Sequence, residues 1–205
     1  MKLTTAFYTR PDVVQISKEL LGKTLCTRFD GRLAKAIITE TEAYAGITDK
    51  ASHAYGGRRT KRTEVMFREG GHAYIYLCYG IYSLFNVVTN VAGIPHAVLI
   101  RGAIASGGVG IMLQRTGRGK ITGGLLSGPG KLAKAMGLHY SQTGTSLTGA
   151  TIWIEDAGIV IPPEAITITP RIGIGYAAED ALLPYRFQVD REGLSPNPVF
   201  CHLCS

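Results

Sequence analysis

Apolar positions along the first forty residues predict one helix followed by a β-hairpin. Val13, Ile16 and Leu20 repeat at helical spacing, Pro11 stands at the expected first helical position, and Gly22 ends the pattern. Two apolar stretches, 24–29 and 33–41, then flank Asp30-Gly31. An Asp-Gly pair between apolar stretches is a strong predictor of a tight hairpin turn.

The rest of the chain mixes strands and helices without regular alternation. Strands are expected at 73–78, 82–89, 97–104, 151–154, 166–169 and 185–189, and helices at 109–115 and 129–136. This order predicts an α+β fold, a curved and largely antiparallel sheet with surrounding helices. We expect one domain over 1–205, with 195–205 a loose C-terminal tail. Residues 46–71 lack periodicity and predict a long, functional loop with a short helix near 63–67.

Composition favours a folded protein with a polyanionic partner. Hydrophobic residues make up 45% of the chain, and the formal net charge is +7. Four of the five residues 58–62 are basic, namely Arg58, Arg59, Lys61 and Arg62; a solvated loop and a phosphate-binding loop both fit this cluster.

Hydropathy and cysteine content bear on the cellular location of the protein and on metal binding. No apolar run approaches the roughly 18 residues of a membrane span, and the N-terminus has no apolar signal core, so neither a membrane nor secretion is expected. Four scattered cysteines indicate a reducing, cytoplasmic compartment. Cys201 and Cys204 resemble half of a zinc site, but no second ligand pair lies nearby, so no metal is predicted.

Two carboxylates end the strand that precedes the long loop. Alternation places Glu40 and Glu42 on one face. Solvated charges at a strand edge would look the same, but Glu42 precedes Tyr44, and a carboxylate among aromatic rings is a candidate general base. Local sequence does not choose between the two.

A histidine and a group of tyrosines are candidate ligands for a nucleic-acid base. His53 stands close to the basic cluster, although a lone histidine is more often a surface or packing residue. Tyr74 and Tyr76 share a face of their strand, and Tyr79 stands at a hairpin turn, where an exposed aromatic suits a wedge or a stacking platform. Ordinary cross-strand aromatic pairing is the alternative, and we expect it for Tyr74 and Tyr82.

Several short motifs together resemble the alkyladenine (3-methyladenine) DNA glycosylase family. Each motif is weak alone, whereas their shared order and spacing over roughly 6–190 is specific. The matching stretches are 20–23, 39–44, Asp49 with 51–53, 66–67, 74–86, 99–101, 127–132, 171–175 and 183–187. The resemblance implies a formyltransferase C-terminal-like fold with a protruding β-hairpin. It also implies a base excision repair enzyme that flips a damaged purine from duplex DNA and hydrolyses its N-glycosidic bond.

The resemblance also implies a role for each matching residue. Glu42 would be the general base that activates water for attack on C1′. Tyr44 and His53 would line one face of the base, and Tyr76 would stack on the other. Tyr79 would intercalate in the gap left by the flipped base.

Four further roles concern selectivity and DNA contact. Asn86 would reject the 2-amino group of normal guanine, and Arg101 would lie near the phosphate of the flipped nucleotide. Main-chain groups near Ala51, His53 and Ile172 would touch the base edge. The cluster 58–62 would contact phosphates.

Family resemblance implies no cofactor and no metal, and no lysine stands beside Glu42 to form a Schiff base, so a monofunctional enzyme is expected. The chain lacks the long N-terminal extension of eukaryotic members, which indicates a bacterial, nucleoid-associated protein, expected as a monomer. Candidate substrates are 3-methyladenine, 7-methylguanine, hypoxanthine and 1,N6-ethenoadenine, with no ranking. The segment 106–124 is short and Gly-rich, so its DNA contacts are open, and the tail 195–205 has no counterpart.

Three alternatives remain. The stretch 126–132 resembles a helix-hairpin-helix turn, although the strand-rich remainder does not suit that helical fold. A non-catalytic nucleic-acid-binding module could use the same basic loop and tyrosines. A formyltransferase-like domain acting on tRNA would share the expected fold.

Overall fold

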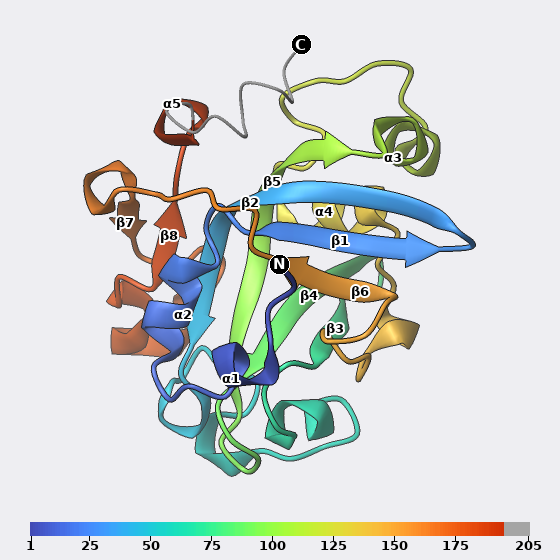
Figure 1. The fold of residues 1–205 in the computed structure, drawn as a ribbon. Helices are drawn as coiled ribbons and strands as arrows, with labels where there is room; N and C mark the ends of the chain where they lie inside the picture. Colours follow the sequence, from blue (N-terminus) through green and yellow to red (C-terminus); the bar gives the residue numbers. More distant parts are fainter. Residues whose placement is uncertain (195–205) are drawn as a thin grey trace.

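The computed structural model describes residues 1–194 and contains one curved antiparallel sheet with helices around it (Figure 1). Its strands are β1 (Thr24–Phe29), β2 (Arg32–Tyr44), β3 (Ala73–Cys78), β4 (Tyr82–Thr89), β5 (His96–Gly107), β6 (Ile152–Glu155), β7 (Thr167–Thr169) and β8 (Arg186–Gln188). The central order is β3-β4-β5-β2-β1-β6, and β8 joins β2 to β7. The α+β fold with a largely antiparallel sheet is confirmed.

Helices cover the sheet and enclose a common core. They are α1 (Thr5–Tyr8), α2 (Val13–Glu19), α3 (Val109–Thr116), α4 (Pro129–Met136) and α5 (Arg191–Leu194). Helix α2 packs against β2 and β5, whereas α4 packs against β4 and β5 and also contacts α3. Buried apolar residues of α2, α4 and the central strands form the main hydrophobic cluster. No helix within residues 1–194 is long and apolar enough to cross a membrane.

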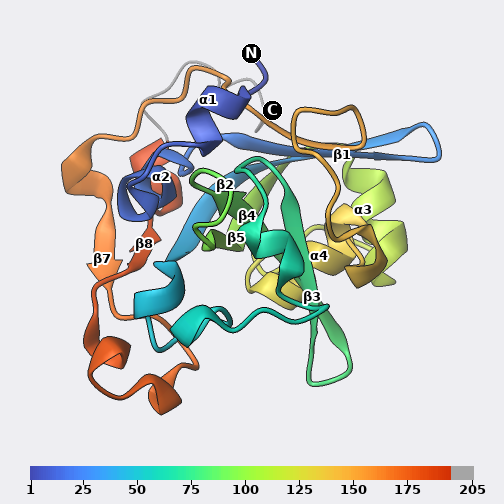
Figure 2. The same cartoon turned by 90° about the horizontal axis from the view of Figure 1, so that it is seen from below.

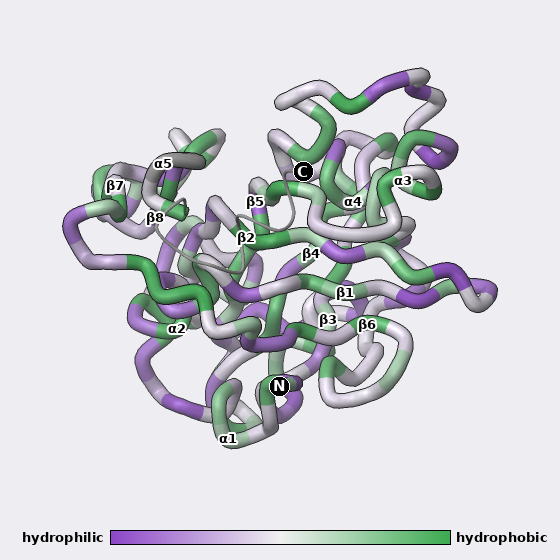
Figure 3. Tube along the Cα trace, turned by 45° about the horizontal axis from the view of Figure 1, so that its top comes forward, coloured by the Kyte–Doolittle hydropathy of each residue, from purple (hydrophilic) through white to green (hydrophobic). Residues whose placement is uncertain are grey.

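Two features of the N-terminus differ from the prediction. Helix α2 begins at Val13 rather than at Pro11, because Asp12 is the N-cap and its side chain accepts a 2.9 Å hydrogen bond from the Gln15 backbone N–H. The short helix α1 has no counterpart in the prediction. The hairpin turn is as expected, since Asp30 and Gly31 both have positive φ (51° and 72°), as a type I′ turn requires. This turn is hydrophilic, whereas the middle of β1 is apolar (Figure 3).

Strand β2 is longer than predicted and changes partner along its length. Its first half pairs with β1 and its second half with β8, while β5 runs along its other edge (Figure 1). Glu42 therefore lies inside the strand and not in the loop after it. Register shifts occur where the partner changes, and the β2–β5 pairing leaves Arg101 without a partner in β2.

The long loop after β2 and the β3–β4 hairpin form the same side of the molecule (Figure 2). The loop folds into three short 3₁₀ helices, Gly46–Thr48, Tyr55–Gly57 and Glu64–Phe67, and the last is the short helix expected near 63–67. Further 3₁₀ turns are Tyr140–Gln142, Pro163–Ala165 and Gly175–Leu182. The hairpin ends in residues 79–81 and projects from the body of the fold.

Candidate active site

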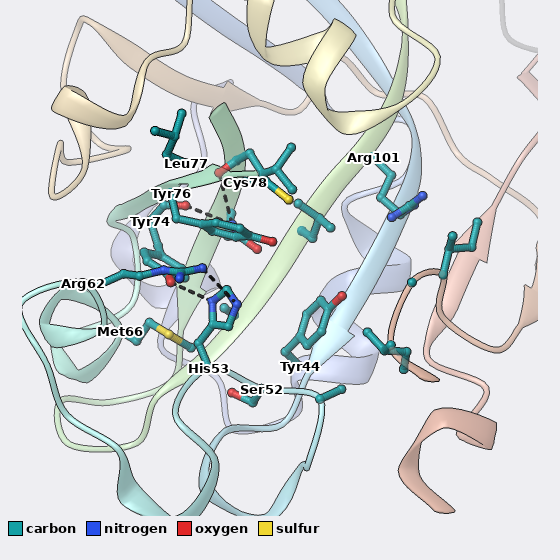
Figure 4. A pocket seen from close by; sticks show the side chains of 18 of the residues that line it. Tyr44, Ser52, His53, Arg62, Met66, Tyr74, Tyr76, Leu77, Cys78 and Arg101 are labelled. Atoms are coloured by element: carbon teal, nitrogen blue, oxygen red, sulfur yellow. Dashed lines mark hydrogen bonds between the residues drawn. The ribbon is translucent and has the colours of Figure 1, made fainter. Parts of the chain in front are cut away.

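A cavity of about 390 Å³ lies between the end of β2, the long loop, the β3–β4 hairpin and the segment 172–176. Tyr44 and Arg101 line one side, and His53, Tyr74, Tyr76 and Arg62 line the other (Figure 4). The full lining is Tyr44, Ala51, Ser52, His53, Arg62, Met66, Tyr74, Tyr76, Leu77, Cys78, Tyr79, Leu84, Asn86, Ala97, Leu99, Arg101, Ile172, Gly173, Ile174 and Tyr176. A concave site with this volume and many aromatic rings suits a flat organic ligand.

Glu42 lies behind the wall of this cavity. Its side chain has no solvent exposure. Oε1 accepts a 2.8 Å hydrogen bond from the Ile172 backbone N–H, and Oε2 accepts one of 2.8 Å from the Tyr44 hydroxyl. The Arg101 Nη1 lies 3.4 Å from the same Oε2. All three partners belong to lining residues, so Glu42 lies directly beneath the cavity surface.

The environment of Glu42 strengthens it as a base. Burial raises the pKa of this carboxyl above its ordinary value, and the opposing influences of Arg101, the Ile172 N–H and the Tyr44 hydroxyl are smaller. Burial and the neighbouring Glu42 carboxylate raise the pKa of Tyr44, so its hydroxyl remains a donor. A carboxylate with a raised pKa accepts a proton more readily than a solvated one.

Both predicted carboxylates reach Arg101, as expected for side chains on one face of β2. Arg101 Nε lies 3.1 Å from Oε1 of Glu40, which also accepts a 2.7 Å hydrogen bond from Arg186 Nε. Glu40 is thus held between two guanidinium groups, whereas Glu42 contacts the cavity wall. The predicted phosphate contact of Arg101 stays a prediction; in this structure its side chain is 13% exposed and paired with both carboxylates.

His53 lies on the side of the cavity opposite to the one predicted. The family resemblance implies a place beside Tyr44, but the His53 ring packs edge to face on Tyr76 with 4.6 Å between centroids (Figure 4). At this distance the two rings are in contact and no base fits between them. In this structure Tyr44 therefore forms the side of the cavity opposite Tyr76.

The protonation of His53 follows from its two hydrogen bonds. Arg62 Nη2 lies 3.2 Å from Nε2, and a guanidinium is only a donor, so Nε2 is the acceptor. Nδ1 then carries the proton and donates to the Tyr74 hydroxyl, 2.8 Å away. Burial, with Arg62 and Arg58 nearby, lowers the pKa of His53 to about 4, so the ring is neutral near neutral pH.

The sequence pattern did not predict the contacts made by Arg62, Tyr176, Tyr74 and Tyr82. Arg62 is not only a surface cation, because its guanidinium lies 4.7 Å from the Tyr76 ring centroid. Tyr176 donates a 3.2 Å hydrogen bond to the Ala51 carbonyl. Tyr74 and Tyr82 do not form cross-strand aromatic pairs, because their partners in the register are Asn86 and Cys78. Spacing alone gives no indication of these contacts.

The remaining predicted residues lie in the cavity wall or at the tip of the β3–β4 hairpin. Asn86 is buried in the cavity wall, and its Nδ2 donates to the Tyr74 carbonyl at 3.0 Å. The Ile172 N–H, expected at the base edge, is already donated to Glu42. Tyr79 is 90% exposed at the hairpin tip, with φ of 50°. This left-handed conformation is uncommon for a residue with a side chain and often marks a functional position.

The basic cluster lies next to the cavity and is not uniform. All four residues are exposed, but Nε and Nη2 of Arg59 both donate to Glu64, at 2.8 and 2.7 Å. Cys201 and Cys204 lie outside the described residues. Within residues 1–194, no group of three or more His, Cys, Asp or Glu side chains is placed to hold a metal ion.

A carboxylate beneath an aromatic cavity, beside an exposed tyrosine and a basic loop, is the combination expected of a site that acts on a nucleic-acid base. The sequence profile described as methylpurine-DNA glycosylase matches residues 6–193. This chain therefore belongs to the methylpurine-DNA glycosylase family, hydrolases that cleave N-glycosyl bonds in DNA repair.

Relatives of similar length agree with this assignment. A Chlamydia felis protein named "Putative 3-methyladenine DNA glycosylase" is 46% identical over 186 residues, 90% of this chain and 94% of that protein. A Bacillus cereus protein of the same name is 44% identical over 199 residues, 91% of this chain and 95% of that protein. A Chlamydia abortus protein, also so named, is 45% identical over 186 residues.

Proposed function

We propose that this protein is a monofunctional 3-methyladenine DNA glycosylase of base excision repair. It flips alkylated or deaminated purines from duplex DNA and hydrolyses the N-glycosidic bond, which leaves an abasic site. The proposed substrates are 3-methyladenine, 7-methylguanine, hypoxanthine and 1,N6-ethenoadenine. The enzyme acts as a monomer on chromosomal DNA in the bacterial nucleoid. One observation carries the proposal, namely the buried Glu42 carboxylate directly behind Tyr44 and Arg101.

Base flipping fits the shape of this site. Stacking hides the glycosidic bond, so the nucleotide must leave the duplex at a cost of a few kcal/mol, least for damaged pairs. Tyr79 stands exposed at the hairpin tip, where it fills the gap in the stack. In the cavity, stacking on Tyr44 and Tyr76 returns roughly 1–3 kcal/mol per base, and more for a cationic methylated purine.

Hydrolysis then requires a water and a base. Methylated purines are good leaving groups, so the protein needs to activate water and to stabilise positive charge on the sugar. Glu42 serves both purposes because it is anionic and its pKa is raised. Glu42 has no solvent exposure in this structure, so a water reaches it only when the contacts of Tyr44 and Arg101 with Oε2 open.

The lining of the cavity supports a monofunctional mechanism. A bifunctional glycosylase forms a Schiff base through an amine, which then promotes strand cleavage. Among the described residues that line the cavity there is no lysine. We therefore expect an intact abasic strand as product, and a borohydride-trapped covalent adduct would contradict this.

The test is single-turnover release of 7-methylguanine and hypoxanthine from lesion duplexes by the parent and by Glu42→Gln. The variant keeps the shape but loses the base, and we expect a rate loss of about 10²–10⁴-fold with lesion binding retained. Glu155→Gln is the control, because Glu155 is likewise an ion-paired glutamate of the sheet but is 25% exposed and lies outside the cavity.

Two other outcomes would contradict different parts of the proposal. Release by Glu42→Gln at the parental rate would exclude Glu42 as the base and make Glu40 the next candidate. No release by the parent from any duplex of the lesion panel would contradict the enzyme and favour a binding module.

A further inference from the structure

Glu42, Arg101, Glu40 and Arg186 form a chain of alternating charges that leads from the cavity wall to β8. Arg101 Nη1 lies 3.4 Å from Glu42 Oε2, Arg101 Nε 3.1 Å from Glu40 Oε1, and Arg186 Nε 2.7 Å from that same Oε1. We propose that Glu40 is a positioning residue of the glycosylase reaction, which draws Arg101 away from Glu42 and so keeps Glu42 a strong base. This inference rests on the proposed role of Glu42.

The irregular pairing of β2 and β5 makes this sharing of Arg101 possible. Glu40 is opposite Gly102 and Thr41 is opposite Ile100, so Arg101 is the extra residue between them. A Cβ at Gly102 would lie 3.1 Å from both Cβ and Oε2 of Glu40, so this glycine leaves room for the Glu40 side chain. The bulge therefore directs one guanidinium toward two carboxylates.

The two carboxylates compete for Arg101 unequally. The Nε contact to Glu40 is the shorter one, whereas 3.4 Å to Glu42 is near the limit of a hydrogen bond. A guanidinium fully paired with Glu42 would stabilise its anionic form and weaken it as a base. Glu40 prevents this by giving Arg101 a second anionic partner.

Charge balance gives the direction of each substitution. Glu40, Glu42, Arg101 and Arg186 sum to zero, so loss of the Glu40 charge leaves two cations beside one carboxylate. The Glu42 anion is then stabilised and its pKa falls. Loss of the Arg186 cation has the opposite effect, and Arg186 lies opposite Glu42 in the β2–β8 register. If Glu40 had a purely structural role, the two substitutions would not shift the Glu42 pKa in opposite directions.

Apart from the substituted Glu40 or Arg186, the charged and titratable groups around Glu42 remain constant in the two variants. Charged or titratable side chains face it from its own strand, from β5, from β8 and from the segment after β7, and the Ile172 N–H donates to it. They are Glu40 and Tyr44 on β2, Arg101 on β5, Arg186 on β8, and Arg171 and Tyr176 after β7.

The test compares pH–rate profiles of single-turnover excision for the parent, Glu40→Gln, Arg186→Gln and the control Glu155→Gln. Glutamine preserves the shape of Glu40 and accepts a hydrogen bond. We expect the acid limb of Glu40→Gln to move to lower pH by about one pH unit and that of Arg186→Gln to move to higher pH. The control should match the parent.

A second readout does not depend on excision. In protein labelled with ¹³C at the glutamate carboxyl, the Glu42 resonance is identified by its loss in Glu42→Gln, and its titration is followed in each variant. The same opposite shifts are expected. If the parent excises no base, the proposed function fails, whereas this titration still decides the role of Glu40.

Unshifted acid limbs and an unshifted Glu42 titration in Glu40→Gln would overturn the proposal, even if its rate falls. Thermal melting checks that each variant folds. If Glu40→Gln does not fold, Arg186→Gln decides alone, and an unchanged or lower Glu42 pKa in that variant would overturn the proposal.

Discussion

Arg171 and Asp49 form a buried two-contact ion pair beneath the candidate active site, with side chains 0% and 1% exposed. Arg171 Nη1 lies 2.5 Å from Oδ2 and Nη2 lies 2.9 Å from Oδ1. The pair joins three of the four segments around the cavity. Arg171, just before the segment 172–176, also donates to the Ala43 carbonyl in β2, and Asp49 in the long loop accepts the Ala51 N–H. Ile172, whose N–H binds Glu42, follows directly.

Removal of this arginine is therefore expected to be costly. Arg171→Met leaves the Asp49 carboxylate buried without its cation, and we expect a loss of about 3–5 kcal/mol in the free energy of unfolding. Urea denaturation measures it. The exposed pair Lys50–Glu179 is the comparison, and Lys50→Gln should have little effect on stability. Equal effects of the two substitutions would contradict a central structural role for Arg171.

His53 should make the fold sensitive to acid. Its pKa is about 4 in the folded protein, below the ordinary value of 6.5, so the unfolded chain binds the proton more readily. The stabilising contribution of the neutral ring is complete above pH 6.5 and is lost as the pH falls toward 4. In His53→Gln the free energy of unfolding should depend less steeply on pH in this window. Identical slopes for parent and variant would exclude this contribution.

Arg62 should contribute to the low pKa of His53, since it places a cation next to Nε2. Removal of that charge in Arg62→Gln is expected to raise the pKa of His53, because the protonated ring then meets less repulsion. Titration of the His53 ring by NMR measures the change. A pKa that stays at the parental value would show that Arg62 does not contribute to lowering it.

Tyr79 should act on base flipping and not on folding. Its side chain is 90% exposed and has no core to support, so Tyr79→Ala should melt as the parent does. The variant should capture less of the flipped state, measured by the fluorescence of 1,N6-ethenoadenine in a duplex. Tyr140→Ala is the matched control, an exposed tyrosine outside the cavity lining. A parental flipping equilibrium in Tyr79→Ala would exclude the wedge.

The exposed members of the basic cluster should make DNA binding sensitive to salt. Each phosphate contact that is lost reduces the slope of log K against log[salt] by about 0.9. We expect this for Arg58→Ala and for Lys61→Ala, measured by fluorescence anisotropy. Arg59→Ala should reduce the slope less, because Arg59 is already paired with Glu64. Equal reductions for all three would show that the Glu64 pair opens on DNA.

Local patterns predicted the features that depend on near neighbours in the chain. The Asp30-Gly31 turn, the helix over 129–136 and the tip at Tyr79 are confirmed, because turn chemistry, a proline at the first helical position and alternation act within a few residues. The start of α2 was misplaced because two suitable residues, Pro11 and Asp12, are adjacent, and the Asp12 side chain forms the cap.

The sequence by itself determined the family, the sheet-rich fold and several of the residues that line the cavity, because these follow from local pattern and from motifs in a fixed order. Tertiary structure alone decided the arrangement. It placed His53 against Tyr76, paired Arg171 with Asp49 across more than a hundred residues, and put Arg101 between Glu40 and Glu42. These contacts depend on a register irregularity and on how separate loops meet around one cavity, and no interaction between near neighbours in the chain encodes either.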